Sequence, residues 1–175
     1  MTPGSEVQID YAKMGLLYDP LSMKRKTVYA FIATLSHSRH KYVEFVYRQD
    51  QVSFVSSNVK MLEFFGGVPL RIVLDNLKSG VIKPDLYDPQ FNRSYREMAE
   101  YYDCFLDPCR VADPKGKAKV ERDVQTVRDQ FRKMVALNER LDINQANQKI
   151  KQWCREEYGQ KKAWHNRTKA VSRFY

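Results

Sequence analysis

The apolar run TVYAFIATL, Thr27–Leu35, constrains the fold more than any other stretch of the chain. Its β-branched and aromatic residues leave no polar face, which is typical of a central strand covered on both sides. A polar turn, Ser36–Arg39, follows it, and Tyr42–Tyr47 alternates imperfectly, as the return strand of a hairpin would. Upstream, Val7–Tyr11 reads as a short strand that ends on Asp10. We therefore expect three successive antiparallel strands.

Beyond these strands, helical and strand-like spacing alternate. Apolar residues recur at steps of three and four over Phe54–Phe65, and the glycine pair that follows is typical of a helix end. Two short strands are expected, Arg71–Leu74 and Phe105–Leu106. The helix between them is expected to start at Ser94, which stands with Glu97 in capping-box spacing. This strand, helix, strand order predicts a parallel crossover.

Two helices are expected in the last third of the chain. Pro114 suits the first turn of a long helix, whose apolar stripe is Val120, Val124, Val127, Phe131 and Met134. A final helix, Ile143–Tyr158, is expected to be capped by Asp142. The complete order predicts an α/β protein with a five-stranded mixed sheet flanked by helices, which is the element order of the ribonuclease-H-like fold. We expect a catalytic core over residues 1–136, and a helix and basic tail over 137–175 that pack on it or extend from it.

The positive charge of the chain is concentrated near its C-terminal end. Residues 1–109 contain 13 Lys/Arg and 13 Asp/Glu, whereas residues 110–175 contain 17 and 8, which accounts for the whole net charge of +9. A charge excess of this kind favours a polyanionic partner such as nucleic acid. A lysine-rich helix surface in water would give the same count, so the charge leaves both interpretations open.

Several classes of protein and site are not indicated. No stretch approaches the roughly 18 apolar residues of a membrane span, and residues 1–10 do not resemble a signal peptide, so we expect a soluble, intracellular protein. The three cysteines lack Cys-x-x-Cys spacing, so they predict neither a disulfide framework nor a zinc site but reduced, buried or half-buried thiols. His37 and His40 fall in the expected hairpin turn without a cysteine partner, and we expect both at the surface.

Three carboxylates stand where a two-metal phosphodiester site would need them. Two divalent ions about 3.5–4 Å apart activate the attacking oxygen and neutralise the leaving one, and hard cations prefer carboxylate ligands. Asp10 lies in the first expected strand, Asp75 directly follows a buried one, and Glu121 borders the buried face of the long helix. Among 21 acidic residues such spacing also arises by chance, and each acid could instead end a strand, begin a turn or pair with a lysine.

Basic residues accompany two of these acids. Along the expected helix, Lys117, Gln125 and Arg128 lie on the same side as Glu121 at spacings of four and seven residues. We expect phosphate contacts, which add salt-dependent affinity without base specificity, from the basic residues beside the acids: Lys78, Lys115, Lys117, Lys119, Arg122 and Arg128. Solvated lysines at a helix end remain the alternative.

Three sequence blocks resemble a known family. EVQIDYAKMG around Asp10, VLDNLKSGV around Asp75 and DPKGKAKVERDVQ around Glu121 resemble the blocks of the IstA-type insertion-sequence transposases, a part of the larger group that includes retroviral integrases. HNRT and SRF near the end resemble that family's tail. The resemblance implies a ribonuclease-H-like fold and a DDE triad of Asp10, Asp75 and Glu121 that binds two Mg²⁺ or Mn²⁺ ions.

The resemblance also implies an activity and partners. It implies hydrolytic release of 3′-hydroxyl DNA ends and their transfer into target DNA, an AAA+ helper ATPase, a homo-oligomer assembled on DNA, and a place in the bacterial cytoplasm at the nucleoid. Such transposases carry an N-terminal helix-turn-helix region and further residues after the core. This sequence shows neither, so we expect a core fragment of weak activity without specific end recognition.

Two other functions fit the same residues. A ribonuclease H or junction resolvase would share the fold and the metal-binding acids. A DNA-binding assembly domain would share the fold and the positive charge, with a vestigial site.

Overall fold

The computed structural model describes residues 5–74, 89–107 and 114–158, and these contain a mixed sheet of five strands. The strands are β1 (Glu6–Asp19), β2 (Lys24–Leu35), β3 (Lys41–Val46), β4 (Arg71–Leu74) and β5 (Phe105–Asp107). They lie in the order β3-β2-β1-β4-β5. The first three pair in antiparallel fashion, and β4 is parallel to both β1 and β5. The mixed sheet expected from the sequence is confirmed.

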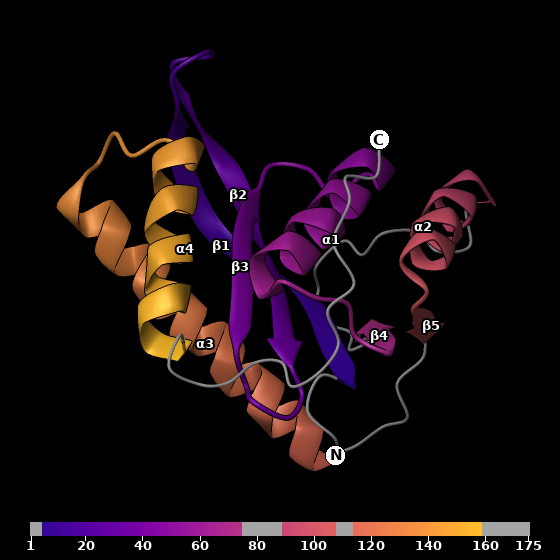
Figure 1. Cartoon of the computed structure of the whole chain (residues 1–175). Helices are drawn as coiled ribbons and strands as arrows, with labels where there is room; N and C mark the ends of the chain where they lie inside the picture. Colours follow the sequence, from indigo (N-terminus) through magenta and orange to yellow (C-terminus); the bar gives the residue numbers. More distant parts are fainter. Residues whose placement is uncertain (1–4, 75–88, 108–113, 159–175) are drawn as a thin grey trace.

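Helices cover both faces of the sheet (Figure 1). One hydrophobic core lies under α1 (Gln51–Phe65) and α2 (Pro89–Tyr102), and a second lies under α3 (Pro114–Leu137) and α4 (Ile143–Tyr158). Side chains of β1 alternate between these cores, since successive residues of a strand point to opposite faces. The side chains of Val7, Ile9 and Tyr11 join the first core and that of Ala12 joins the second. Asp10 therefore shares the α3 face with Ala12.

Helix ends follow the local signals in the sequence. Gly66 ends α1 in the left-handed conformation at φ 70°, and its N–H donates to the carbonyl of Leu62 at 3.0 Å. A residue with a Cβ is disfavoured in that conformation, which explains the glycine. Asp142 caps α4, because its Oδ1 accepts a hydrogen bond from the backbone N–H of Gln145 at 2.8 Å. Both expected helix ends are confirmed.

β1 is longer than the sequence pattern predicts. The strand was expected to end on Asp10 but continues to Asp19, and its pairing with β2 extends from Val7↔Leu35 to Asp19↔Lys24. A register shift between Lys13 and Gly15 explains the difference. Such a bulge changes which face the later side chains point to, so that the apolar and polar residues no longer alternate in one period.

Two other local expectations are wrong. α2 begins at Pro89, so Ser94 lies inside the helix, where its hydroxyl accepts a hydrogen bond from Gln51 of α1 instead of capping. Proline suits a first helical turn. His40 is buried at 9% exposure rather than at the surface, and its ring packs edge-on against Phe64 and Phe65. His37 is exposed, as expected.

Two of the three cysteines lie in the described residues. Cys104 is half-buried and Cys154 is buried, neither in a disulfide, and burial raises the pKa of the Cys154 thiol to about 12. Within the described ranges, none of the helices has the length and apolar character needed to cross a bilayer.

Candidate active site

Asp10 is placed by the parallel pairing of β1 with β4. That register joins Ile9 to Leu74, the residues that immediately precede Asp10 and Asp75 in the sequence. Asp10 is partly exposed, and its Oδ1 accepts a hydrogen bond from the backbone N–H of Tyr11 at 2.8 Å. Asp75 lies outside the described residues. The sheet therefore places side by side the two residues that directly precede Asp10 and Asp75.

α3 runs alongside β1 in the same direction. Val124 lines a cavity of about 10 Å³ together with Asp10, which is about the space of one water. One turn later, Arg128 Nε donates to the Lys13 carbonyl at 3.3 Å. Further along, the ring of Phe131 faces Gly15 so closely that a Cβ there would be 3.1 Å from Phe131 Cε1. The helix thus follows β1 from Asp10 to Gly15.

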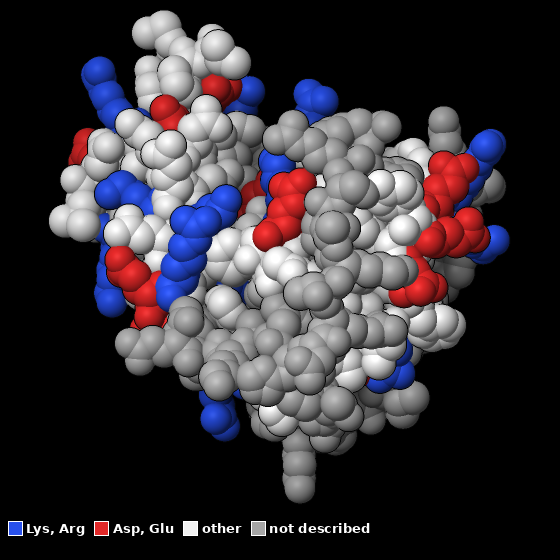
Figure 2. Space-filling view, viewed as in Figure 1, with Lys and Arg blue, Asp and Glu red and all other residues white. Residues whose placement is uncertain are grey.

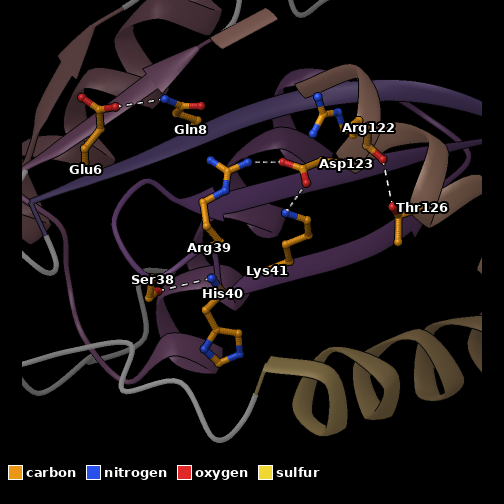
Figure 3. A network of polar contacts seen from close by, with 9 residues as sticks. All are labelled: Glu6, Gln8, Ser38, Arg39, His40, Lys41, Arg122, Asp123 and Thr126. Atoms are coloured by element: carbon orange, nitrogen blue, oxygen red, sulfur yellow. Dashed lines mark hydrogen bonds and ion pairs between the residues drawn. The ribbon is translucent and has the colours of Figure 1, made fainter. Parts of the chain in front are cut away.

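A buried ionic network holds α3 against the β2–β3 turn (Figure 3). Lys41 Nζ lies 2.8 Å from Asp123 Oδ1, and Arg39 pairs with the other oxygen of the same carboxylate. The Lys41 side chain is only 1% exposed, whereas that of Asp123 is 21% exposed. Burial lowers the pKa of Lys41, and the hydrogen bond and charge of Asp123 oppose that effect. A buried ammonium requires such an anion, so the pair fixes the rotation of α3 about its axis.

A second network ties β4 to β1 at the opposite end of their pairing. The buried Glu6 carboxylate accepts hydrogen bonds from Arg71 Nε at 3.1 Å and Ser36 Oγ at 2.8 Å, and Gln8 Nε2 lies 3.2 Å from it. Burial by itself would raise the pKa of Glu6, but these hydrogen bonds outweigh it, and the pKa is lowered. The carboxylate stays charged and holds β4 in register with β1.

The structure describes some of the predicted site residues and not others. Glu121 and Arg122 are exposed on α3, and Arg128 is half-buried against β1. Asp75 and Lys78 lie outside the described residues, and the side chains of Lys115, Lys117 and Lys119 are likewise not described. Among the described side chains, no three His, Cys, Asp or Glu residues form a group that could hold a metal. On the face in Figure 2, basic and acidic side chains are interspersed.

The Lys41–Asp123 pair was missed by the sequence reasoning. The two residues stand 82 positions apart, and a lysine at a strand start is ordinarily a surface residue. The one local signal that could have pointed to Asp123 is its place two residues after Glu121, on a helix that has an apolar stripe.

Comparison with known proteins shows what the chain is similar to. No family model matches it. A protein of Mycobacterium tuberculosis named "Putative transposase Rv3428c" is 51% identical over 128 residues, which are 73% of this chain and 31% of that protein. The transposase for insertion sequence element IS21 of Pseudomonas aeruginosa is 29% identical over 70% of this chain and 31% of its own length. The chain thus spans about a third of the curated relatives it matches.

Solved structures share the fold. The catalytic core domain of HTLV-2 integrase in complex with magnesium superposes with a TM-score of 0.60 at 15% identity, covering 86% of each chain. A chain of the simian T-cell lymphotropic virus intasome gives 0.63 at 15% identity, covering 86% of this chain and 48% of that one. The chain is therefore a homologue of insertion-sequence transposases, built on the ribonuclease-H-like fold of the retroviral integrase catalytic core.

Proposed function

We propose that this chain is the catalytic core of a DDE transposase, of the IstA type, which hydrolyses phosphodiesters and joins DNA ends to target DNA. Asp10, Asp75 and Glu121 are its metal-binding triad. The observation that carries the proposal is the parallel register of β1 and β4, in which Ile9 pairs with Leu74. Each partner is followed by one of the proposed acids. Asp10 lies within β1, where its pairing with β4 stops, and Asp75 comes directly after the carboxyl end of β4, where α/β folds form their sites.

The alternation of β4 supports a role for Asp75 beside Asp10. Ile72 and Leu74 belong to the core under α1 and α2. Side chains alternate along a strand, so a next residue in the same conformation would point toward the α3 face, as Asp10 does.

The rotation of α3 supports the third acid. Asp123 faces the β2–β3 turn through Lys41 and Arg39. Glu121 precedes Asp123 by two residues and so projects about 200° away around the helix, toward the side on which β4 lies beside β1. It also precedes Arg128 by seven residues, about two turns, and Arg128 reaches the backbone of β1. Glu121 would thereby lie near Asp10, on the α3 face of the sheet.

The donor set suits a hard divalent cation. Asp10 offers a partly exposed carboxylate whose Oδ1 is oriented by the Tyr11 backbone N–H, and Glu121 offers an exposed one. Carboxylate oxygens are the ligands that Mg²⁺ and Mn²⁺ prefer, and the HTLV-2 core was solved with magnesium. Two bound ions would supply activation of the attacking oxygen and neutralisation of the leaving one. The protein side chains orient the carboxylates and hold α3 and β4 at fixed positions.

The DNA would contact the start of α3 and the acidic site beside it. Lys115, Lys117, Lys119, Arg122 and Arg128, with Lys78, are proposed to contact phosphates beside the acids. Arg122 is exposed and can contact a phosphate directly. Arg128 Nε donates to the Lys13 carbonyl, so Arg128 would contact DNA with its terminal nitrogens. A homo-oligomer assembled on DNA and an AAA+ helper ATPase complete the proposal.

A strand-transfer assay with pre-cut DNA ends in Mg²⁺ or Mn²⁺ tests this function. Asp10→Asn, Asp75→Asn and Glu121→Gln should each lower joining more than about 100-fold, because losing a ligand costs more than losing one of its supports. Asp129→Asn is the matched control, since Asp129 is an exposed acid two turns further along α3, and it should retain joining. Joining that survives Asp75→Asn would refute the assignment.

Two further outcomes separate the alternative functions. Cleavage of RNA–DNA hybrids without joining of DNA ends would favour a ribonuclease. DNA binding without any Mn²⁺-dependent rise in melting temperature would favour an assembly domain with a vestigial site, because a ligand that binds the folded state stabilises it.

A further inference from the structure

The far end of the β1–β2 hairpin projects from the body of the protein (Figure 1). Beyond the bulge at Lys13–Gly15 the two strands stay paired up to Asp19↔Lys24. Residues 20–26, which form the turn and the start of β2, are all exposed. We name residues 20–26 the hairpin tip. Neither the acidic site nor the two hydrophobic cores use it.

Large apolar side chains of the hairpin tip stand in solvent. Leu21 is 96% exposed and Met23 is 77% exposed. Scattered exposed apolar residues are ordinary, but these two are two positions apart in one turn at the end of a projecting ribbon. In Figure 2 this end of the molecule is largely uncharged, with both basic and acidic side chains beside it.

The turn that presents them is held in one conformation. Asp19 accepts hydrogen bonds from the Leu21 backbone N–H at 3.2 Å and from Ser22 Oγ at 2.8 Å. Its carboxylate also pairs with Lys26 Nζ at 2.7 Å. Met23 adopts a left-handed backbone at φ 56°, which a non-glycine residue keeps only when its surroundings impose it. The backbone that carries the two apolar side chains is thus held by contacts within the turn.

The charges of the hairpin tip indicate the partner's chemistry. Lys26 is engaged by Asp19 and lies 5.7 Å from the centre of the Tyr47 ring. Lys24 and Arg25 are exposed and make no ion pair with any described acid. Two cations beside two apolar side chains suit a duplex whose groove takes an apolar wedge while its phosphates take the cations.

We propose that the hairpin tip binds duplex DNA, with Leu21 and Met23 in a groove and Lys24 and Arg25 on the flanking phosphates. The binding itself does not depend on the catalytic proposal, but its position does. Asp10 and Asp19 are nine residues apart on β1, about 30 Å at 3.3 Å per residue. For a duplex that runs along β1, with about 3.4 Å per base pair, the tip would meet DNA about nine base pairs from the phosphate at the acidic site.

Fluorescence anisotropy with a 30-base-pair duplex in EDTA tests the binding, using the full 175-residue chain at several salt concentrations. Lys24→Ala/Arg25→Ala should weaken binding about fivefold and reduce the slope of log Kd against log salt by about 2, one phosphate contact per cation. Leu21→Ser/Met23→Ser should weaken binding without changing that slope. Because EDTA removes divalent ions, failure here is distinguishable from failure of the catalytic proposal.

Matched controls are available on the helices. Lys149→Ala/Lys151→Ala removes two exposed cations from α4, and Leu137→Ser removes an 87% exposed leucine at the end of α3; both should leave affinity and slope unchanged. An equal loss in the lysine control would overturn the proposal, as would an unchanged slope in Lys24→Ala/Arg25→Ala. So would Leu21→Ser/Met23→Ser abolishing self-association in sedimentation with unchanged DNA affinity, because the tip would then meet a second copy.

The position is tested with 2-aminopurine placed nine base pairs from a pre-cut end. Its fluorescence should rise when the unsubstituted chain binds, because a wedge unstacks the base, and should not rise with Leu21→Ser/Met23→Ser. A rise at other positions alone would overturn the placement but leave the binding supported.

Discussion

Replacing Asp123 by asparagine isolates the energetic role of the buried ionic network. The substitution keeps the shape of the side chain and its ability to accept a hydrogen bond, but it removes the anion 2.8 Å from Lys41 Nζ. In this variant the ammonium of Lys41, whose side chain is 1% exposed, has lost its paired carboxylate. Breaking one partner of a buried pair typically costs about 3–5 kcal/mol.

The pH sets an upper limit on that cost. Lys41 can avoid a buried charge by losing its proton, which costs about 1.4 kcal/mol for each pH unit below its ordinary pKa of 10.5. The part of the loss in Asp123→Asn that comes from the buried Lys41 charge is therefore at most about 5 kcal/mol at pH 7 and about 2 kcal/mol at pH 9. The unfolded variant binds the proton more tightly than the folded one, so its stability rises with pH toward 10.5.

Urea unfolding at pH 7, 8 and 9, followed by circular dichroism, measures this difference. Lys41→Met should cost little, because Asp123 keeps Arg39 and an apolar side chain of similar length suits a buried site. Lys41→Met/Asp123→Asn should recover most of the stability that Asp123→Asn loses. A loss below about 1 kcal/mol at pH 7, a loss independent of pH, or no rescue by Lys41→Met would refute the reasoning.

Three further substitutions, one of them with a control at the end of α1, test how the hairpin and α4 are held. Gly15→Ala should destabilise the protein by about 1–3 kcal/mol as a fall in Tm, because the new Cβ would lie 3.1 Å from Phe131 Cε1; Gly66→Ala, with open space at its Cβ, isolates backbone strain without a clash. Asn147→Ala should cost about 1–3 kcal/mol in urea unfolding, since the Asn147 amide bonds both the N–H and the C=O of Phe45 at 2.7 and 3.0 Å. Hydrogen bonds from Lys26, Ser22 and the Leu21 backbone lower the pKa of Asp19 to about 2 from 3.8. Its stabilisation is therefore complete above about pH 4 and is lost as pH falls toward 2, and acid titrations of unfolding should show this step in the unsubstituted chain but not in Asp19→Asn.

The order of elements could be predicted from the sequence because its signals are local. An apolar run, a change of period and a glycine or aspartate at a helix end act over a few residues, and β4 and α4 were predicted within their observed bounds. Weaker local signals gave wrong predictions where a contact between residues distant in the sequence determined the local structure. Ser94 looks like a cap, yet it bonds Gln51 of α1 inside a helix that starts earlier.

For the candidate site, the sequence indicated which acids to consider and only the tertiary structure decided how their elements meet. The pairing of Ile9 with Leu74 depends on a parallel register between strands that are far apart in the chain, and no local pattern encodes it. The burial of Lys41 likewise depends on α3 and α4 closing over the sheet, which turns an ordinary strand-start lysine into the partner of Asp123. The sequence determines the residue types, but the charge pairs and the alignment of β1 with β4 arise only when distant segments exclude water between them.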